Sequence, residues 1–324
     1  MNLKVSDIGE RGLLEILQKF CPAEIIGDDA AVLDLPGDRS LVVTTDVLVN
    51  NVHFSDATTS AEDVGWRAAA ANLSDLAAMG AEAIAITVGL ALPPDLSVSW
   101  VERLYQGMTD CLQRYNTPIV GGDICRASEI SVSITALGAV AKDGAIRRYN
   151  ANVGDSIVIT GYHGLSRAGL ELLLHPETGR DLSERDREIL IQAHQRPKPR
   201  LDCLPYLQEI VKRSRIAGMD SSDGLADALL QICRGSGTGA RIDRVPLSPA
   251  LVEYVSPEQA LDWALYGGED FELVLCMTEE FAGGFAEHAG EGAAIIGRIV
   301  SGDEVTLADG KRLDFSASFQ HFSP

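Results

Sequence analysis

Five short acidic segments hold the residues of this chain whose types and spacing could do chemistry. Each contains an aspartate close to Gly, Ser, Thr or Asn, and four of the five lie at the edge of a predicted helix or strand. They are Gly27-Asp28-Asp29, Thr44-Thr45-Asp46, Asn72-Leu73-Ser74-Asp75, Gly121-Gly122-Asp123 and Asp220-Ser221-Ser222-Asp223-Gly224. Mg²⁺ takes oxygen ligands, commonly one or two carboxylates together with phosphate oxygens and waters. Jointly, the five segments predict a magnesium cluster that binds phosphate groups.

Asp75 carries the most information because it lies inside a predicted helix made mostly of Ala, Leu and Met. At helical spacing it shares a face with Ala68, Asn72 and Met79, which directs its carboxylate toward packed surroundings. A buried carboxylate is costly unless it is paired or bound to metal. For any one such residue, bracing of a neighbouring loop is the better interpretation. Taken together, however, the five segments favour metal binding by the aspartates over this structural interpretation.

The segment Asp220–Gly224 also has the composition of an isolated turn. An EF-hand loop is excluded, because its alternating ligands and terminal Glu are missing. We expect Ser221 or Ser222 to cap a helix that begins near Asp223. Its N-terminal N–H groups would then lie where a phosphate could bind.

The elements that must position these residues follow from periodicity and turn signals. Ser60 and Asp63 form a capping box for a helix that ends at Gly80, and Asp309-Gly310 is predicted as a hairpin turn. Strands are predicted at 30–35, 40–49, 83–92, 117–120, 130–140, 156–160, 271–277 and 293–300. Helices are predicted around 101–112 and at 165–174, 183–194, 201–214 and 224–234.

The length of 324 residues exceeds a usual single hydrophobic core, so two domains are expected. A new unit starts near Gly154-Asp155, and strands and helices alternate without a regular βαβ rhythm. We therefore expect two α+β or mixed α/β domains, at residues 1–150 and 151–324, in preference to one doubly wound sheet.

Composition limits the function classes. Hydrophobic residues make up 46% and charged residues 23%, which indicates a folded chain. The net charge of -20 disfavours binding to nucleic acid or to an acidic membrane surface. Phosphate could bind to such a chain only if clustered Lys/Arg or metal ions reversed the local field. The first residues lack a signal-peptide pattern and the six cysteines lack C-x-x-C spacing, so we expect a cytoplasmic protein with reduced thiols.

Other motifs are absent or weak. No G-x-x-x-x-G-K-[ST] occurs, which argues against a P-loop enzyme. The glycines of 235–240 follow a predicted helix and not a strand, so they indicate a helix exit rather than a dinucleotide site. His53 is the only histidine near the acidic segments in sequence. Contact with a substrate and a bond to nearby backbone explain it about equally well.

Six blocks in order resemble the signature of the thiamine-monophosphate kinase family. They are IGDDAAVL, TTDVLVNNVHF, NLSDLAAMGA, GGDICR, MDSSDGLADAL and YGGEDFELVL, and they extend over nearly the whole chain. That family belongs to the superfamily of aminoimidazole ribonucleotide synthetase and selenophosphate synthetase. The resemblance implies an N-terminal α/β domain that binds ATP and magnesium and dimerises, plus a C-terminal α+β domain. It also implies a homodimer that binds ATP with several Mg²⁺ ions across its interface.

The resemblance further implies roles for individual residues. Magnesium would be bound by Asp29, Thr44, Thr45, Asp46, Asp75, Asp123, Asp220 and Asp223, with Asp28 adjoining. ATP would contact Tyr105, Gly121, Gly122, Arg148 and Ser222, and the substrate would contact His53, Glu269 and Phe319. Core packing explains Phe319 nearly as well, and a strand-edge salt bridge is the alternative for Glu269.

Two positions depart from the family pattern. Ile124 stands where the family generally has Thr, so a hydroxyl contact is lost there. Asn150 replaces a common Gly but still tolerates a left-handed backbone. The second change leaves open whether Arg147 or Arg148 faces ATP, and spacing to Gly154-Asp155 favours Arg148.

The implied reaction is the phosphorylation of thiamine monophosphate by ATP, the last step toward thiamine diphosphate. The acceptor phosphate, with a second pKa of about 6, is largely dianionic at pH 7 and needs no general base. Catalysis would rest on positioning and on charge neutralisation by the magnesium cluster and Arg148, without a covalent intermediate. Activation of another acceptor, such as a purine precursor or selenide, and non-enzymatic binding of metal or thiamine phosphate are the alternatives.

Overall fold

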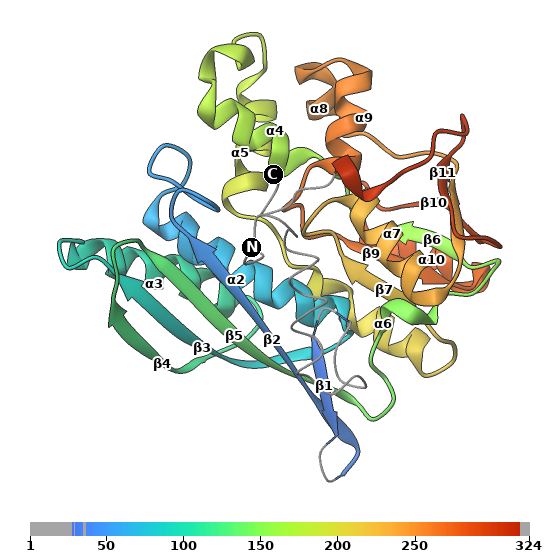
Figure 1. Ribbon diagram of the computed structural model, residues 1–324, viewed down its shortest axis with the longest axis horizontal. Coiled ribbons are helices and arrows are strands. Elements are labelled where there is room, and N and C mark those ends of the chain that lie inside the picture. Colours follow the sequence, from blue (N-terminus) through green and yellow to red (C-terminus); the bar gives the residue numbers. More distant parts are fainter. Residues whose placement is uncertain (1–27, 29, 35–36, 318–324) are drawn as a thin grey trace, which may run out of the picture.

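The structure is a computed structural model that describes residues 28, 30–34 and 37–317. It has two parts, each built on its own sheet, with helices packed between and around them (Figure 1). The predicted mixed α/β class is therefore confirmed. Among the described residues, no helix is long and apolar enough to cross a membrane.

The N-terminal sheet has five strands in the order β1-β2-β5-β3-β4. The strands are β1 (Ala31–Asp34), β2 (Arg39–Val49), β5 (Ser131–Ala141), β3 (Glu82–Leu92) and β4 (Ile119–Arg126). All neighbours are antiparallel except β3 and β4. Because β1 pairs only with the first part of β2, the second part, which carries the Thr44–Asp46 segment, has no paired strand on that side within the described chain.

Two helices, α2 (Ala61–Ala78) and α3 (Val98–Gln113), cover one face of this sheet. Burial alternates along β5, as expected for a sheet covered on one face only. The other face carries Thr45 and Thr135, whose hydroxyls bond to each other across the strands. No helix of the described residues covers this face, which we call the open face.

Helix α2 is the centre of the molecule. It packs against β2 and β5 of the first sheet and against β7 of the second. Nearly every one of its residues is buried, which explains why the helix is rich in Ala and has apolar residues on every side. The predicted capping box is confirmed, since the Ser60 side chain accepts from Asp63 N. Gly80 follows the helix with φ of +71°, as its predicted left-handed role requires.

Glycines let α2 and α3 cross closely. A Cβ at Gly65 would lie 1.9 Å from Leu104 O, and a Cβ at Gly107 would lie 1.7 Å from Glu62 O. Both obstacles are backbone atoms, which cannot rotate away. The close contact between the two helices therefore requires glycine, which has no side chain, at both positions.

The C-terminal sheet has six strands in the order β11-β8-β10-β6-β9-β7. The strands are β11 (Val305–Leu307), β8 (Gly239–Ile242), β10 (Ala294–Val300), β6 (Ser156–Ile159), β9 (Leu273–Met277) and β7 (Ala217–Asp220). The α-helices are α4 (Leu165–Leu174), α5 (Glu184–Gln195), α6 (Leu204–Val211), α7 (Leu225–Ser236), α8 (Pro249–Tyr254), α9 (Pro257–Tyr266) and α10 (Glu279–Ala289). Short 3-10 turns are η2 (Arg148–Asn150), η3 (Pro176–Gly179), η4 (Arg200–Cys203) and η5 (Phe315–Ala317).

The structure corrects three local predictions. Strand β4 continues to Arg126, so Gly121, Gly122 and Asp123 lie within the strand and not after it. Helix α7 begins at Leu225 with Gly224 as its N-cap and no side-chain cap. The Ser221 hydroxyl instead donates to Glu272 O at 3.0 Å, because the segment is held against the neighbouring strand. The short strands β7 and β8 were not predicted.

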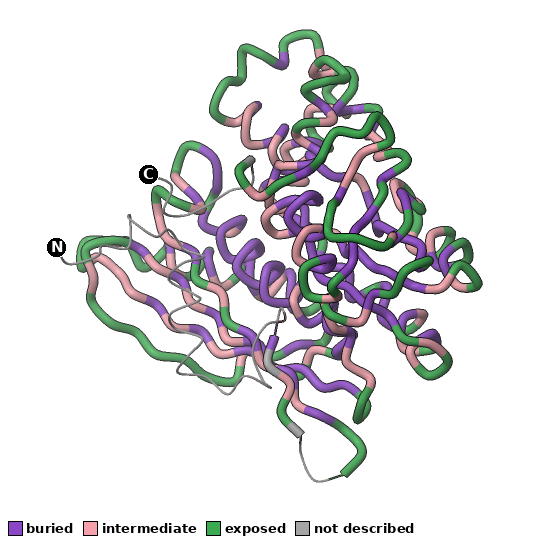
Figure 2. The backbone as a smooth tube through the Cα atoms, turned by 45° about the vertical axis from the view of Figure 1, so that its right-hand side comes forward, coloured by how far each residue is buried: buried purple, intermediate pink, exposed green. Residues whose placement is uncertain are grey.

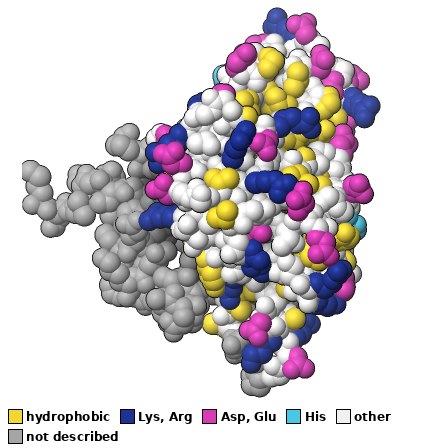
Figure 3. All heavy atoms as spheres, turned by 90° about the vertical axis from the view of Figure 1, so that its right-hand side faces the viewer, with side chains coloured by type: hydrophobic (Ala, Val, Ile, Leu, Met, Phe, Trp, Pro, Cys, Tyr) yellow, Lys and Arg dark blue, Asp and Glu magenta, His cyan; other side chains and the backbone are white. Residues whose placement is uncertain are grey.

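Burial is concentrated along the middle of the molecule, whereas the outer loops are exposed (Figure 2). The face of the C-terminal part in Figure 3 carries acidic and basic side chains interspersed with one another. The net charge of -20 is therefore not expressed as a single acidic surface there.

Candidate active site

Helix α2 collects the acidic segments from both sheets. The Thr44 hydroxyl donates to Asp75 Oδ2, and Asp46 N donates to Asn72 Oδ1 at 3.2 Å. One residue before Asp75, the Ser74 hydroxyl donates to Asp220 Oδ2 at 2.7 Å. The predicted convergence of these three segments on one another is thus present in the structure.

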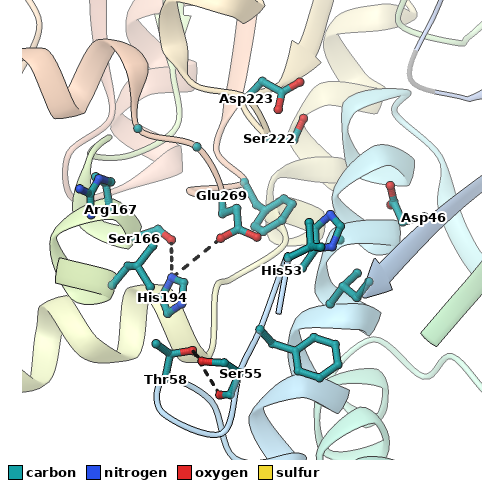
Figure 4. A pocket seen from close by; sticks show the side chains of 18 of the residues that line it. Asp46, His53, Ser55, Thr58, Ser166, Arg167, His194, Ser222, Asp223 and Glu269 are labelled. Carbon is teal, nitrogen blue, oxygen red and sulfur yellow. Dashed lines mark hydrogen bonds and ion pairs between the residues drawn. The ribbon is translucent and has the colours of Figure 1, made fainter. Parts of the chain in front are cut away.

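A cavity of about 900 Å³ opens beside this cluster. The predicted residues that line it are Thr45, Asp46, His53, Ser222, Asp223 and Glu269. Asp46, Ser222 and Asp223 lie toward one side, while His194, Ser166 and Thr58 lie on the other, with Glu269 and His53 between them (Figure 4). The cavity therefore has an acidic side and a side of neutral polar groups, with Arg167 next to the latter.

Asp28 contacts both arginines between which the sequence could not choose. Arg147 Nη1 donates to Asp28 Oδ2 at 3.1 Å, and Arg148 N donates to Asp28 Oδ1 at 2.8 Å. The Arg148 side chain extends instead to Gln231 Oε1 of α7, at 2.6 Å. Neither arginine lines the cavity, so the structure leaves the choice open.

Asp123 and the glycines before it do not join the other segments within one chain. They lie on the edge strand β4, which β5 and β3 separate from β2. Three strand spacings correspond to about 14 Å. Register places Asp123 opposite Gly89, Ser133 and Val47, on the open face of the sheet. Tyr105, on α3, also lies outside the cavity.

His53 both bonds to nearby backbone and faces the cavity, the two roles that the sequence left open. Its Nδ1 accepts a hydrogen bond from Val49 N at 3.0 Å, and the side chain also lines the cavity. Because Nδ1 is the acceptor, Nε2 is the nitrogen that carries a proton.

Glu269 likewise forms a salt bridge and lines the cavity. Its backbone has φ of +66°, a left-handed conformation that is uncommon for a residue other than glycine. Arg67, which is 2% exposed on α2, donates to Glu269 Oε1. Burial favours the neutral acid, but the charge of Arg67 outweighs this effect and holds the pKa of Glu269 below its ordinary value.

Sequence reasoning missed Arg67, His194 and Ser166. Arg67 Nη1 lies 2.7 Å from His194 Nε2, and His194 Nδ1 lies 3.2 Å from the Ser166 hydroxyl. Burial lowers the pKa of His194 to about 4, so the ring is neutral at pH 7. Arg67 was detectable by the signal that singled out Asp75, since it is a charge on an Ala-rich helix. His194 and Ser166 carry no comparable signal.

The donor set has the chemistry of a magnesium site. The cluster offers carboxylates and hydroxyls, and a hard cation prefers oxygen ligands of this kind. Those from the described residues are Thr44, Asp46, Asp75, Asp220 and Asp223, whereas the Thr45 hydroxyl bonds to Thr135 on the open face of the sheet and does not join them. In the described ranges, however, no three His, Cys, Asp or Glu side chains are grouped closely enough to hold an ion by themselves. Asp29 and Phe319, two of the predicted site residues, lie outside the described residues.

Comparison with known proteins places the fold and cavity in a defined class. Residues 27–140 match the N-terminal domain, and residues 152–310 the C-terminal domain, of AIR synthase related proteins. The thiamine-monophosphate kinase of Synechococcus elongatus is 51% identical over 98% of each chain, and that of Aquifex aeolicus is 34% identical over 99% of this chain and all of its own. The structure of AaThiL complexed with AMPPCP and TMP is similar, with a TM-score of 0.88 and 34% identity over 99% of this chain and 100% of that one.

The chain belongs to the thiamine-monophosphate kinase family, as the six sequence blocks predicted.

Proposed function

We propose that this protein transfers the γ-phosphoryl group of ATP to thiamine monophosphate, which yields thiamine diphosphate and ADP. The observation that carries the proposal is the cavity of about 900 Å³, in which acidic groups from both sheets face Glu269 and His53. Family membership supports it, as does the similar structure of AaThiL with AMPPCP and TMP. An ATP-dependent reaction of this kind fits a cytoplasmic enzyme of thiamine diphosphate biosynthesis.

The acidic side of the cavity would hold Mg²⁺ through the oxygen donors named above, with Asp29 and Asp123 added. When bound, the ions supply positive charge that lets phosphates enter a strongly acidic protein. Asp46, Asp75 and Asp223 keep that charge at one side of the cavity. Thr44 orients the Asp75 carboxylate and Ser74 orients that of Asp220, which fixes the donors before a ligand arrives.

The residues of the chain act mainly by positioning. A phosphate dianion is already nucleophilic, so no side chain has to remove a proton. Within the described residues, the cavity lining contains no cysteine and no pairing of a serine with an activating base beside the acidic side. Transfer is therefore direct, with the two phosphates held in line.

ATP would be contacted by Ser222 in the cavity and by Arg148 beside α7. Arg148 would add positive charge near the phosphates, because its guanidinium always carries a proton. Gly121 and Gly122, on the edge strand β4, and Tyr105, on α3, all lie outside the cavity.

We propose that a second copy of the chain supplies those residues. The N-terminal sheet exposes apolar side chains, with Val47 45%, Ile84 45%, Val120 59% and Ile124 65% exposed. Exposed apolar side chains of this kind are typical of a dimer interface. Asp123 lies on the open face together with Val47, whereas Ile124 is exposed at the edge strand β4, so pairing of two sheets would bring Asp123 toward the partner's site. Residues 1–150 would then bind ATP and magnesium and dimerise, and residues 151–324 would complete the substrate side.

An acceptor panel tests the function against the alternatives. ADP release with ATP and Mg²⁺ should depend on thiamine monophosphate and not on a purine precursor or selenide. ADP release with a different acceptor would replace the proposal with that acceptor. Thermal stabilisation by thiamine monophosphate or Mg²⁺ without ADP release would support a binding protein instead.

A further inference from the structure

The side of the cavity away from the acidic cluster is built from residues of three helices and of the segment between α9 and β9. Arg67 of α2, His194 of α5, Ser166 of α4 and Glu269 form a continuous contact chain. Figure 4 shows Ser166, His194 and Glu269 next to one another in the cavity. Arg67, His194 and Ser166 are each at most 2% exposed, whereas the Glu269 side chain is 34% exposed. Such buried polar groups have fixed hydrogen-bonding roles, which can be deduced one after another.

The first role is that of the imidazole. A guanidinium has only donors, so His194 Nε2, at 2.7 Å from Arg67 Nη1, must accept. The ring is neutral at pH 7, because burial and then the charge of Arg67 lower its pKa to about 4. A neutral imidazole with an accepting Nε2 carries its proton on Nδ1. His194 Nδ1 is therefore a donor.

The second role is that of the hydroxyl. The Ser166 oxygen lies 3.2 Å from His194 Nδ1, within hydrogen-bond distance, whereas Glu269 Oε2 lies 3.9 Å from that nitrogen. Ser166 therefore accepts from His194 and must direct its own proton elsewhere. Within the described residues, its hydroxyl makes no other hydrogen bond, and Ser166 lines the cavity. The hydroxyl is left as a donor toward a ligand.

The third role is that of Glu269. Its Oε1 accepts from Arg67, and its Oε2 is in reach of the cavity. With its pKa held below the ordinary value, the group is an ionised acceptor. Ser166 Oγ and Glu269 Oε2 both lie within 4 Å of His194 Nδ1, at 3.2 and 3.9 Å, so a donor and an acceptor stand side by side.

We propose that Ser166 and Glu269 together recognise the aminopyrimidine edge of thiamine monophosphate. The exocyclic amino group donates to Glu269, and the adjacent ring nitrogen accepts from Ser166. Arg67 and His194 are positioning residues, since they fix the directions of the two contacts. The inference rests on the proposed function and adds to it the recognition of the ring. Ring and phosphate then lie on opposite sides of the cavity, with the phosphate toward Asp46 and Asp223.

Adenine presents the same pattern of amino group and ring nitrogen, so the adenine ring of ATP is the other group that could bind to Ser166 and Glu269. The test measures KM for both substrates. Ser166→Ala should raise KM for thiamine monophosphate about 5- to 10-fold, the usual effect of one lost hydrogen bond, with KM for ATP unchanged. Ser156→Ala is the matched control, because its buried hydroxyl has no hydrogen-bond partner in the described structure and lies outside the cavity. A rise in KM for ATP alone, or no change in either KM, would overturn the proposal.

The positioning role of His194 has its own variants. Asn places an amide donor near the position of Nδ1, whereas Leu removes all hydrogen bonding. His194→Leu should reproduce the KM effect of Ser166→Ala, and His194→Asn should restore KM for thiamine monophosphate to within about 3-fold of wild type. Equal KM values for the two variants would show that His194 only fills space.

An altered substrate tests the pattern directly. In the analogue of thiamine monophosphate whose amino group is replaced by an oxo group, the edge presents an acceptor and then a donor. Wild type should prefer thiamine monophosphate by about 100-fold or more in kcat/KM, and Glu269→Gln should reduce that preference below about 10-fold. An equal preference in both proteins would contradict the assignment.

Calorimetric titration with thiamine monophosphate in the absence of ATP distinguishes failure of the proposed function from failure of the proposed ring recognition. If the protein has no kinase activity, weaker binding of thiamine monophosphate by Ser166→Ala than by wild type still supports the ring site.

Discussion

Ser74 and Asp220 are 146 residues apart in the chain, yet their side chains form a direct hydrogen bond of 2.7 Å. The bond joins the middle of α2 to the end of β7 and hence the N-terminal part to the C-terminal sheet. On the next residue of α2, Asp75 accepts from Thr44 of β2. One helix therefore sets the positions of acidic groups from both parts of the protein.

The acidic cluster predicts a specific loss of activity. Asp75→Asn or Asp223→Asn should lower kcat at least about 100-fold, because an amide cannot supply the negative charge that an ion requires. The midpoint of thermal unfolding should stay within a few degrees of wild type. Asp181→Asn, an exposed aspartate away from the cavity, is the control. Full activity of either cluster variant would remove the magnesium assignment.

The position of Asp123 predicts complementation between inactive variants. If the partner subunit supplies Asp123, a mixed dimer of Asp46→Asn and Asp123→Asn chains has one site with both changes and one intact site. Equal mixing should restore about a quarter of wild-type activity, since half of the dimers are mixed. The mixture is unfolded and refolded together before the assay. Activity that stays at the level of the separate variants would place Asp123 outside the shared site.

His163 predicts a pH-dependent stability. The side chain is 0% exposed, and burial lowers its pKa to about 4, an effect that the Gly161 backbone offsets only in part. The unfolded chain, with a pKa of about 6.5, binds the proton first, so stability is lost as pH falls from 6.5 toward 4.

His163→Leu removes this proton linkage while it keeps the site filled. Its free energy of unfolding should equal or exceed that of wild type at pH 7. Between pH 7 and pH 5 it should lose about 2 kcal/mol less than wild type. Urea unfolding at several pH values measures both. Parallel pH profiles for the two proteins would show that His163 has no lowered pKa.

The crossing of α2 and α3 predicts a steric effect. Gly107→Ala should destabilise the protein by about 2 kcal/mol or more, because the added carbon meets the Glu62 carbonyl oxygen. Gly283→Ala, in α10, has nothing within 4 Å of its new carbon and should stabilise the protein by about 0.5 to 1 kcal/mol. Denaturant unfolding of the pair gives the comparison. Equal stability of the two variants would mean that the helices move apart freely.

The predictable parts of this fold are those governed by local patterns. The capping box at Ser60, the left-handed Gly80 and the helix exit at Gly237 follow from short-range chemistry, and the structure has all three. The four-residue strands β7 (AGMD) and β8 (GARI) were not predicted, because each contains a glycine and lacks the run of β-branched residues that reveals β6 (SIVI), a strand of the same length.

The residues of the candidate site also differ in how far the sequence predicts them. Carboxylates and hydroxyls at element edges were visible in the sequence, whereas the side opposite them was not. Arg67, His194 and Ser166 come together only through packing of α2, α5 and α4, and no spacing in the chain encodes that meeting. Asp123 stands in one of the acidic segments of the sequence, but only strand order shows how far it lies from Asp46.

The central claim is tested most directly by following the transferred phosphoryl group. The protein is incubated with ATP labelled in the γ-phosphate, Mg²⁺ and saturating thiamine monophosphate, and products and protein are then separated. We predict label in the terminal phosphate of thiamine diphosphate, one ADP for each product and no label on the protein. Labelled inorganic phosphate without thiamine diphosphate, or no turnover at all, would contradict the account.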